Sequence, residues 1–239
     1  MRMRARSLLV LIFYAVIAYV ALDRWSGGRE AATLPVATRV HQAYRTSFAI
    51  VDWRSRRGSY VSRPRDDLYG WRFLIAPYGD QWRVDYQFKQ PWNSCDNWVA
   101  AHIEEIATGV PDRERTIFVF VEDTGNPRDP LTPIPPAGPS PADTIRCIEV
   151  VHAGRHWAGR WDLTVADLKD LLNTGKTVDG IELTADSFHV ILDDGTVLQI
   201  ARSIPFQKIA PFFASESTEK RDLQAELAPY IVARPRLFE

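Results

Sequence analysis

The stretch SFHVILDDGTVLQIAR, residues 187–202, carries the strongest fold signal in the sequence. Apolar and β-branched residues fill both halves of it. The intervening Asp193-Asp194-Gly195 is typical of a tight turn that joins two antiparallel strands. The stretch therefore predicts a β-hairpin, and it favours an α+β protein over one in which strands and helices alternate regularly.

Further strands are expected on the N-terminal side of this hairpin. Large residues alternate in 70–77 and 81–89 around the turn sequence PYGD, so these two stretches predict a second hairpin with an aromatic face. Apolar, β-branched sequence indicates buried strands at 116–123 and 144–152. A strand at 177–184 completes a meander with the first hairpin.

Helices are expected between these strands. Apolar residues recur at helical spacing from Val36 to Ser47 and lead into the apolar stretch FAIVDW. Thr164 and Asp167 have the spacing of a capping box and Gly175 is a typical terminator, so a helix is predicted between them. Its buried face would carry Val165, Leu168, Leu171 and Leu172. Two more helices are predicted at 98–109 and at 216–233, the latter broken near Pro229. The expected body is α+β, mainly antiparallel and hairpin-rich, with a few short helices.

The first 25 residues predict a single transmembrane helix. Three arginines precede an uncharged apolar run from Leu8 to Leu22, which is the layout of an export signal. As a helix this run is roughly 22 Å long against a hydrocarbon core of about 30 Å, so flanking residues would have to extend it. A small-x-small cleavage site is poorly matched here, which favours an uncleaved anchor over a cleaved signal.

The charge distribution predicts which side of the membrane the body occupies. Because the arginines precede the apolar run, the positive-inside rule places the N-terminus in the cytoplasm. We expect a single-pass protein of the bacterial inner membrane, with residues 8–22 in the lipid bilayer and a periplasmic body at 26–239. Without the three arginines, 26 basic residues stand against 30 acidic ones, which argues against nucleic acid as a partner.

A proline-rich stretch divides the body. Seven prolines between Pro127 and Pro141 exclude both a helix and a central strand. The sequence therefore predicts lobes at about 36–123 and 144–239 joined by a loop at 124–143. Such a loop is either a spacer or a segment available to a partner.

Cys95 and Cys147 are the two cysteines of the chain. An even and minimal count in an exported protein predicts one disulfide. The alternative is a nucleophilic Cys95 with His102 as its base, although Asp96 would raise the pKa of the thiol.

A few residues suggest chemistry. The apolar strand that runs into Asp123-Thr124-Gly125 resembles the motif of retropepsin-like aspartic proteases, in which two such aspartates share a proton and activate water. The resemblance covers only these residues and implies a hydrolase, whereas the same residues are also typical of a turn. His152 and His156 have the spacing of two metal ligands on a helix, which Gly154 disfavours. No cofactor motif is present.

Tryptophans are the other candidates for binding. Trp92, Trp157 and Trp161 lie in loop-like contexts, where aromatic rings serve as anchors in interfaces or stack on sugars. Three classes of function follow. We expect a membrane-anchored, non-enzymatic interaction protein, an accessory or assembly subunit of an envelope complex with a protein partner. The alternatives are a glycan- or lipid-binding module and a hydrolase that uses Asp123.

Overall fold

The structure of the protein is a computed structural model. It describes residues 36–58, 71–72, 75, 87, 89–91, 93–97, 116–122, 143–151, 162–175, 181–184, 186–213 and 221–235. All of them belong to one compact unit, Thr33–Glu239. Within these residues no helix is both long enough and apolar enough to cross a bilayer. The predicted anchor lies outside them and stays a prediction, as does the division into two lobes.

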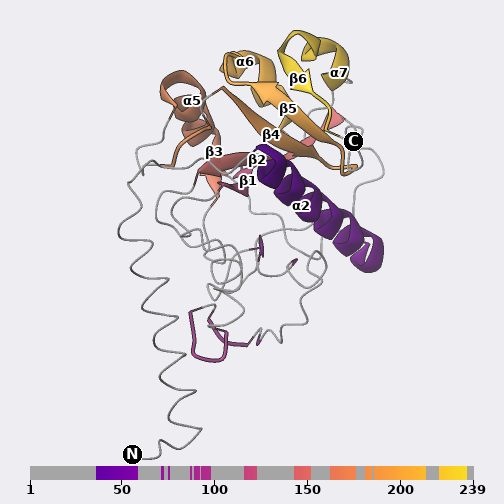
Figure 1. The fold of residues 1–239 in the computed structure, drawn as a ribbon, viewed down its shortest axis with the longest axis vertical. Helices are drawn as coiled ribbons and strands as arrows, with labels where there is room; N and C mark the ends of the chain where they lie inside the picture. Colours follow the sequence, from indigo (N-terminus) through magenta and orange to yellow (C-terminus); the bar gives the residue numbers. More distant parts are fainter. Residues whose placement is uncertain are drawn as a thin grey trace, which may run out of the picture. The chain divides into compact units, whose positions relative to one another are not determined.

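Six described strands form one sheet in the order β3-β1-β2-β4-β5-β6 (Figure 1). Neighbouring strands are antiparallel, except that β3 runs parallel to β1. The expected mixed α+β fold with few helices is thus confirmed. The strands are β1 (Thr116–Glu122), β2 (Ile145–Val151), β3 (Leu163–Thr164), β4 (Ser187–Leu192), β5 (Val197–Ala201) and β6 (Ile231–Ala233).

The hairpin predicted at 187–202 is formed by β4 and β5. Gly195 lies in its turn with a φ of +91°, which a residue with a side chain rarely adopts. Its N–H donates to the carbonyl of Leu192 at 3.0 Å. The Asp194 side chain accepts from the N–H of Thr196 at 2.8 Å, which is an Asx-type turn contact.

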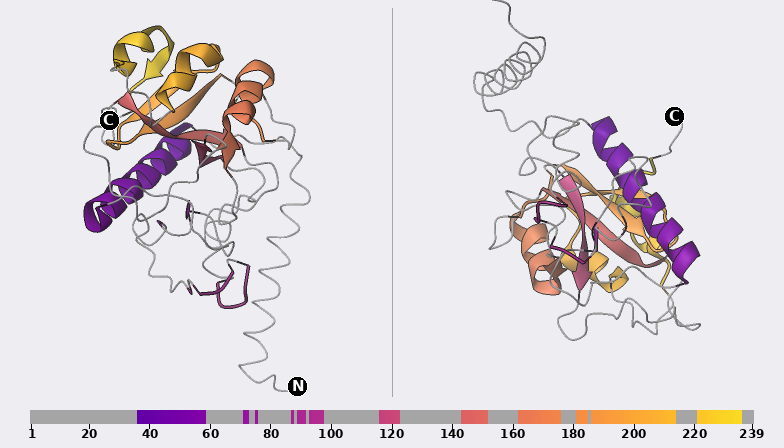
Figure 2. Two further views of the ribbon diagram at one scale, coloured as in Figure 1. Left: turned by 180° about the vertical axis from the view of Figure 1, so that it is seen from behind. Right: turned by 90° about the horizontal axis from the view of Figure 1, so that it is seen from below.

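Helices cover both faces of the sheet, as the views from the front and from behind agree (Figures 1 and 2). The long helix α2 (Val36–Arg57) lies on one face. The other face is covered by α5 (Val165–Thr174), α6 (Phe206–Ile209), η3 (Ala210–Phe212), α7 (Leu223–Glu226) and η4 (Ala228–Tyr230). Because successive strand residues point to opposite faces, the strands divide their apolar side chains between two cores.

The two cores differ in character. The core beneath α5, α6 and α7 is apolar, with strand residues such as Val119, Val190 and Leu198 fully buried. The core beneath α2 is smaller. It joins Phe118 and Phe120 of β1, Cys147 of β2, Ile191 of β4 and Val197 of β5 to Ala43, Ala49, Ile50 and Trp53 of α2, with Trp71 and Ile75 beside them.

The predicted helix signals on both sides of the sheet are largely confirmed. In α5, Thr164 and Asp167 form a complete capping box, and the helix ends at Gly175 in the left-handed conformation. Leu168 and Leu171 are buried as expected, but Val165 in the first turn is exposed. The other helix, α2, continues through FAIVDW to Arg57.

Three expectations of secondary structure need correction, and one strand was not expected. Trp71, Arg72 and Ile75 have helical backbone where a strand was expected. Positions 71 and 75 lie four apart, so both a strand and a helix bring them to one face, and their pattern could not separate the two. In the predicted strand at 177–184, Glu182 forms only an isolated bridge with Val151.

The third correction and the unexpected strand concern the ends of the sheet. The predicted C-terminal helix is broken near Pro229 as expected, but α7 is a single turn and Ile231 begins β6. The two-residue strand β3 has no signal in the sequence. The predicted helix at 98–109 and most of the second predicted hairpin lie outside the described residues.

Candidate functional site

A row of polar side chains crosses the sheet beneath α2. The strand register places Phe118 opposite Glu149 and His189 opposite Gln199. The β2–β4 pairing, in which Ile148 lies opposite Val190, brings Glu149 beside His189. These residues therefore lie on the face of the sheet that α2 covers. Two of them, Glu149 and His189, are ionisable, although the alternation of strand residues predicts apolar core residues at their positions.

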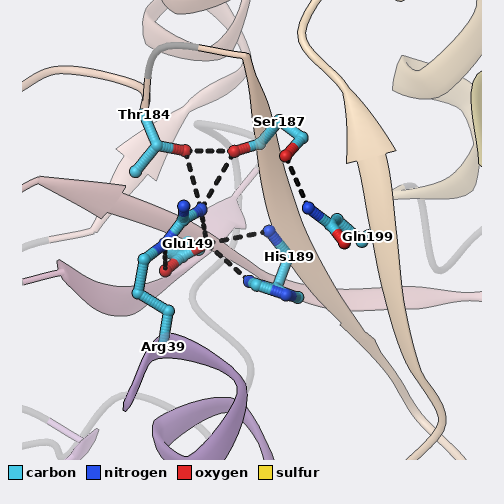
Figure 3. Close-up of polar contacts among 6 residues, drawn as sticks. All are labelled: Arg39, Glu149, Thr184, Ser187, His189 and Gln199. Carbon is cyan, nitrogen blue, oxygen red and sulfur yellow. Dashed lines mark hydrogen bonds and ion pairs between the residues drawn. The ribbon is translucent and has the colours of Figure 1, made fainter. Parts of the chain in front are cut away.

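Arg39 in the first turns of α2 reaches down to this row (Figure 3). Its Nε donates to Oε1 of Glu149 at 2.8 Å, and its Nη2 donates to Oε2 at 2.7 Å, which makes a bidentate ion pair. Nη2 also lies 3.0 Å from the Thr184 hydroxyl and 2.9 Å from the Ser187 carbonyl. The side chains of Arg39 and Glu149 are 8% and 0% exposed.

The surrounding polar groups complete the cluster. The Thr184 hydroxyl donates to the Ser187 carbonyl, which Arg39 also contacts. The Gln199 side-chain amide donates to the Ser187 hydroxyl at 2.7 Å. Arg39 therefore links α2 to Thr184 and to Ser187, the first residue of β4. Gln199 links β5 to the same Ser187.

Glu149 is held as a carboxylate. Burial raises the pKa of this carboxyl group. The hydrogen bonds from Arg39 and His189, together with the electrostatic attraction of both residues, outweigh burial and lower the pKa to about 2. The net result is a buried anion that stays charged at neutral pH because its counter-ion and donors are fixed around it.

His189, like Glu149, has no exposed surface. Its backbone N–H donates to Oε2 of Glu149 at 3.0 Å, and its Nδ1 lies 2.8 Å from the same oxygen. Because a carboxylate can only accept, Nδ1 carries the proton in this contact. The other ring nitrogen, Nε2, is buried and has no hydrogen-bond partner among the described residues.

A second buried acid lies at the opposite side of the α2 core. Oδ1 of Asp162 accepts from the indole N–H of Trp71 at 2.8 Å, from Arg72 at 3.2 Å and from the N–H of Phe120 at 3.1 Å. Trp71 stacks on Phe120 with ring centroids 3.9 Å apart. These contacts tie Trp71 and Arg72 to β1.

A third ion pair closes the far end of β2. Arg146 donates to both carboxylate oxygens of Asp193 at 2.5 and 2.9 Å. Arg54 near the end of α2 donates to the Asp193 carbonyl at 2.9 Å. Each of these polar groups therefore links separate elements, and the three clusters act chemically as internal ties.

Sequence reasoning did not find the central cluster. His189 looked isolated in the sequence because Glu149 lies 40 positions away and Arg39 lies 110 positions from Glu149. A usable signal was present: Glu149 interrupts the apolar residues of CIEVV, and His189 interrupts those of FHVIL. A charged residue in a strand with both faces covered requires a buried partner.

The predicted site residues are mostly not placed by the structure. Asp123, Trp92, Trp157, Trp161, His152 and His156 lie outside the described residues. The described residues contain no group of three potential metal ligands. The suggested protease, metal and aromatic binding sites therefore stay predictions.

The predicted disulfide is not formed in this structure. Cys95 is exposed and Cys147 is buried, and both are free thiols. Cys147 faces the α2 core from β2, where its thiol packs with Phe120 and Ile191. Burial raises the pKa of this thiol well above its usual range, so Cys147 is an inert core residue and no cross-link constrains the fold.

Comparison of the chain with models of known protein families, with curated proteins and with solved structures finds no match. The site must therefore be interpreted from its own geometry.

Proposed function

We propose that this protein is a membrane-anchored, extracytoplasmic, non-enzymatic interaction protein that serves as an accessory or assembly subunit of an envelope membrane complex. The apolar run from Leu8 to Leu22 would be its anchor. The helix α2 begins at Val36, so it is the first described element after that anchor. Residues 26–35, which follow the predicted 25-residue anchor segment, span at most about 35 Å.

This proposal is supported by the contacts that the buried charged residues make. Arg39 directs its hydrogen bonds to Glu149, Thr184 and Ser187, and all of these contacts are internal. A catalytic acid, base or electrophile must reach a substrate. Here the cluster instead fixes α2 to the sheet, so the first described element after the proposed anchor in the sequence is held firmly to the body.

The test is the mass and composition of the particle that contains the full-length protein. We would extract it from its native membranes in mild detergent and determine both quantities. The expected result is a particle with companion proteins in fixed stoichiometry. A lone monomer or homodimer would overturn the proposal in favour of a binding module or an enzyme.

A matched pair of variants tests whether the attachment of α2 to the sheet is needed for binding the companion proteins. Arg39→Met leaves Glu149 as a buried, uncompensated charge and should loosen α2 and lower the yield of companions. Arg39→Met combined with Glu149→Leu and His189→Leu replaces the whole cluster by apolar groups and should restore that yield. Equal yields from the two variants would show that the fixed position of α2 is not needed.

A further inference from the structure

We draw no further inference here: the strongest candidate, the buried Nε2 of His189 in the polar cluster beneath α2, belongs to the site already described, and nothing in the described part of the chain shows what would bind to it.

Discussion

Glu149 is the residue on which the attachment of α2 depends, because its carboxylate accepts four hydrogen bonds, two from Arg39 and two from His189. Such a pair is poor evidence for stability as such, since desolvation offsets much of its attraction. Its value lies in geometry: only one placement of α2 brings Arg39 onto the carboxylate. The apolar core on the other face of the sheet has no comparable constraint.

Glu149→Gln should therefore be strongly destabilising. It leaves the Arg39 guanidinium buried without its counter-ion, and we expect a loss of about 3–5 kcal/mol in the free energy of unfolding. Urea titration followed by circular dichroism measures this. The control is the triple replacement of Arg39, Glu149 and His189 by Met, Leu and Leu, which should lie closer to the wild type. A loss below about 1 kcal/mol in Glu149→Gln would indicate that the pair is not formed.

The pH dependence of stability should report the same carboxylate. Its pKa falls from 4.5 in the unfolded chain to about 2 in the fold, so the folded state binds the proton less well. A depressed pKa contributes stability that is complete above the unfolded value and is lost as pH falls from about 5 towards 2. Urea midpoints over this range should fall more steeply in the wild type than in Glu149→Gln. Parallel profiles would contradict the assignment.

Position 195 requires glycine because of both its backbone conformation and its close neighbours. Its φ is +91°, and a Cβ placed there would lie 2.6 Å from a methyl group of Val51. Gly58 has a φ of +65° but no atom within 4 Å of such a Cβ, which makes it the matched control. We expect Gly58→Ala to cost about 1 kcal/mol and Gly195→Ala clearly more. Thermal unfolding can measure both, and equal losses would mean that α2 does not press on the hairpin.

At the scale of elements, α5 owes its start to side chains that satisfy its free N–H groups. The Thr164 hydroxyl accepts from the N–H of Asp167 at 3.1 Å, and the Asp167 carboxylate accepts from the N–H of Thr164 at 2.9 Å. These contacts are local in sequence, so they could be predicted from it.

Thr164→Ala should lower the free energy of unfolding by about 1 kcal/mol through loss of the cap. Thr174→Ala at the other end of α5 is the control. The Thr174 hydroxyl contacts the Asp170 carbonyl, an exposed bond that gives little stability. Chemical denaturation of the two variants should separate them. An equal effect at both positions would show that the capping box contributes nothing.

The same contrast explains which elements the sequence predicts. The strands β1, β2, β4 and β5 carry apolar runs, and α5 carries its caps, so local pattern was sufficient. The edge strands are short: β3 forms because Asp162 and Leu163 meet β1, and β6 forms beside β5. The Arg39–Glu149 contact depends on pairing across 110 positions, which no local pattern encodes. The sequence indicated only that Glu149 needed a partner.

At the scale of the whole molecule, the layer of α2 joins the two ends of the described chain. Tyr44 donates to the Pro235 carbonyl, and Ser47 donates to the Gly195 carbonyl at 2.5 Å. The sheet itself brings together β1 and β2 from the two sides of the proline-rich stretch. Opening the α2 core should therefore require separation of segments from the beginning, middle and end of the chain.

Cys147 reports that opening directly. Its thiol is fully buried between β2 and α2, whereas Cys95 is exposed. In the folded protein a thiol reagent should modify Cys95 at once and Cys147 more slowly by a factor of at least about 10³, because modification has to wait for a rare opening that costs several kcal/mol. In urea both thiols should react. Mass spectrometry counts the modified sites over time. Rapid modification of Cys147 in the absence of denaturant would show that the α2 layer opens by itself. Fast reaction in Arg39→Met together with slow reaction in the triple apolar variant would trace the opening in Arg39→Met to the unpaired carboxylate of Glu149.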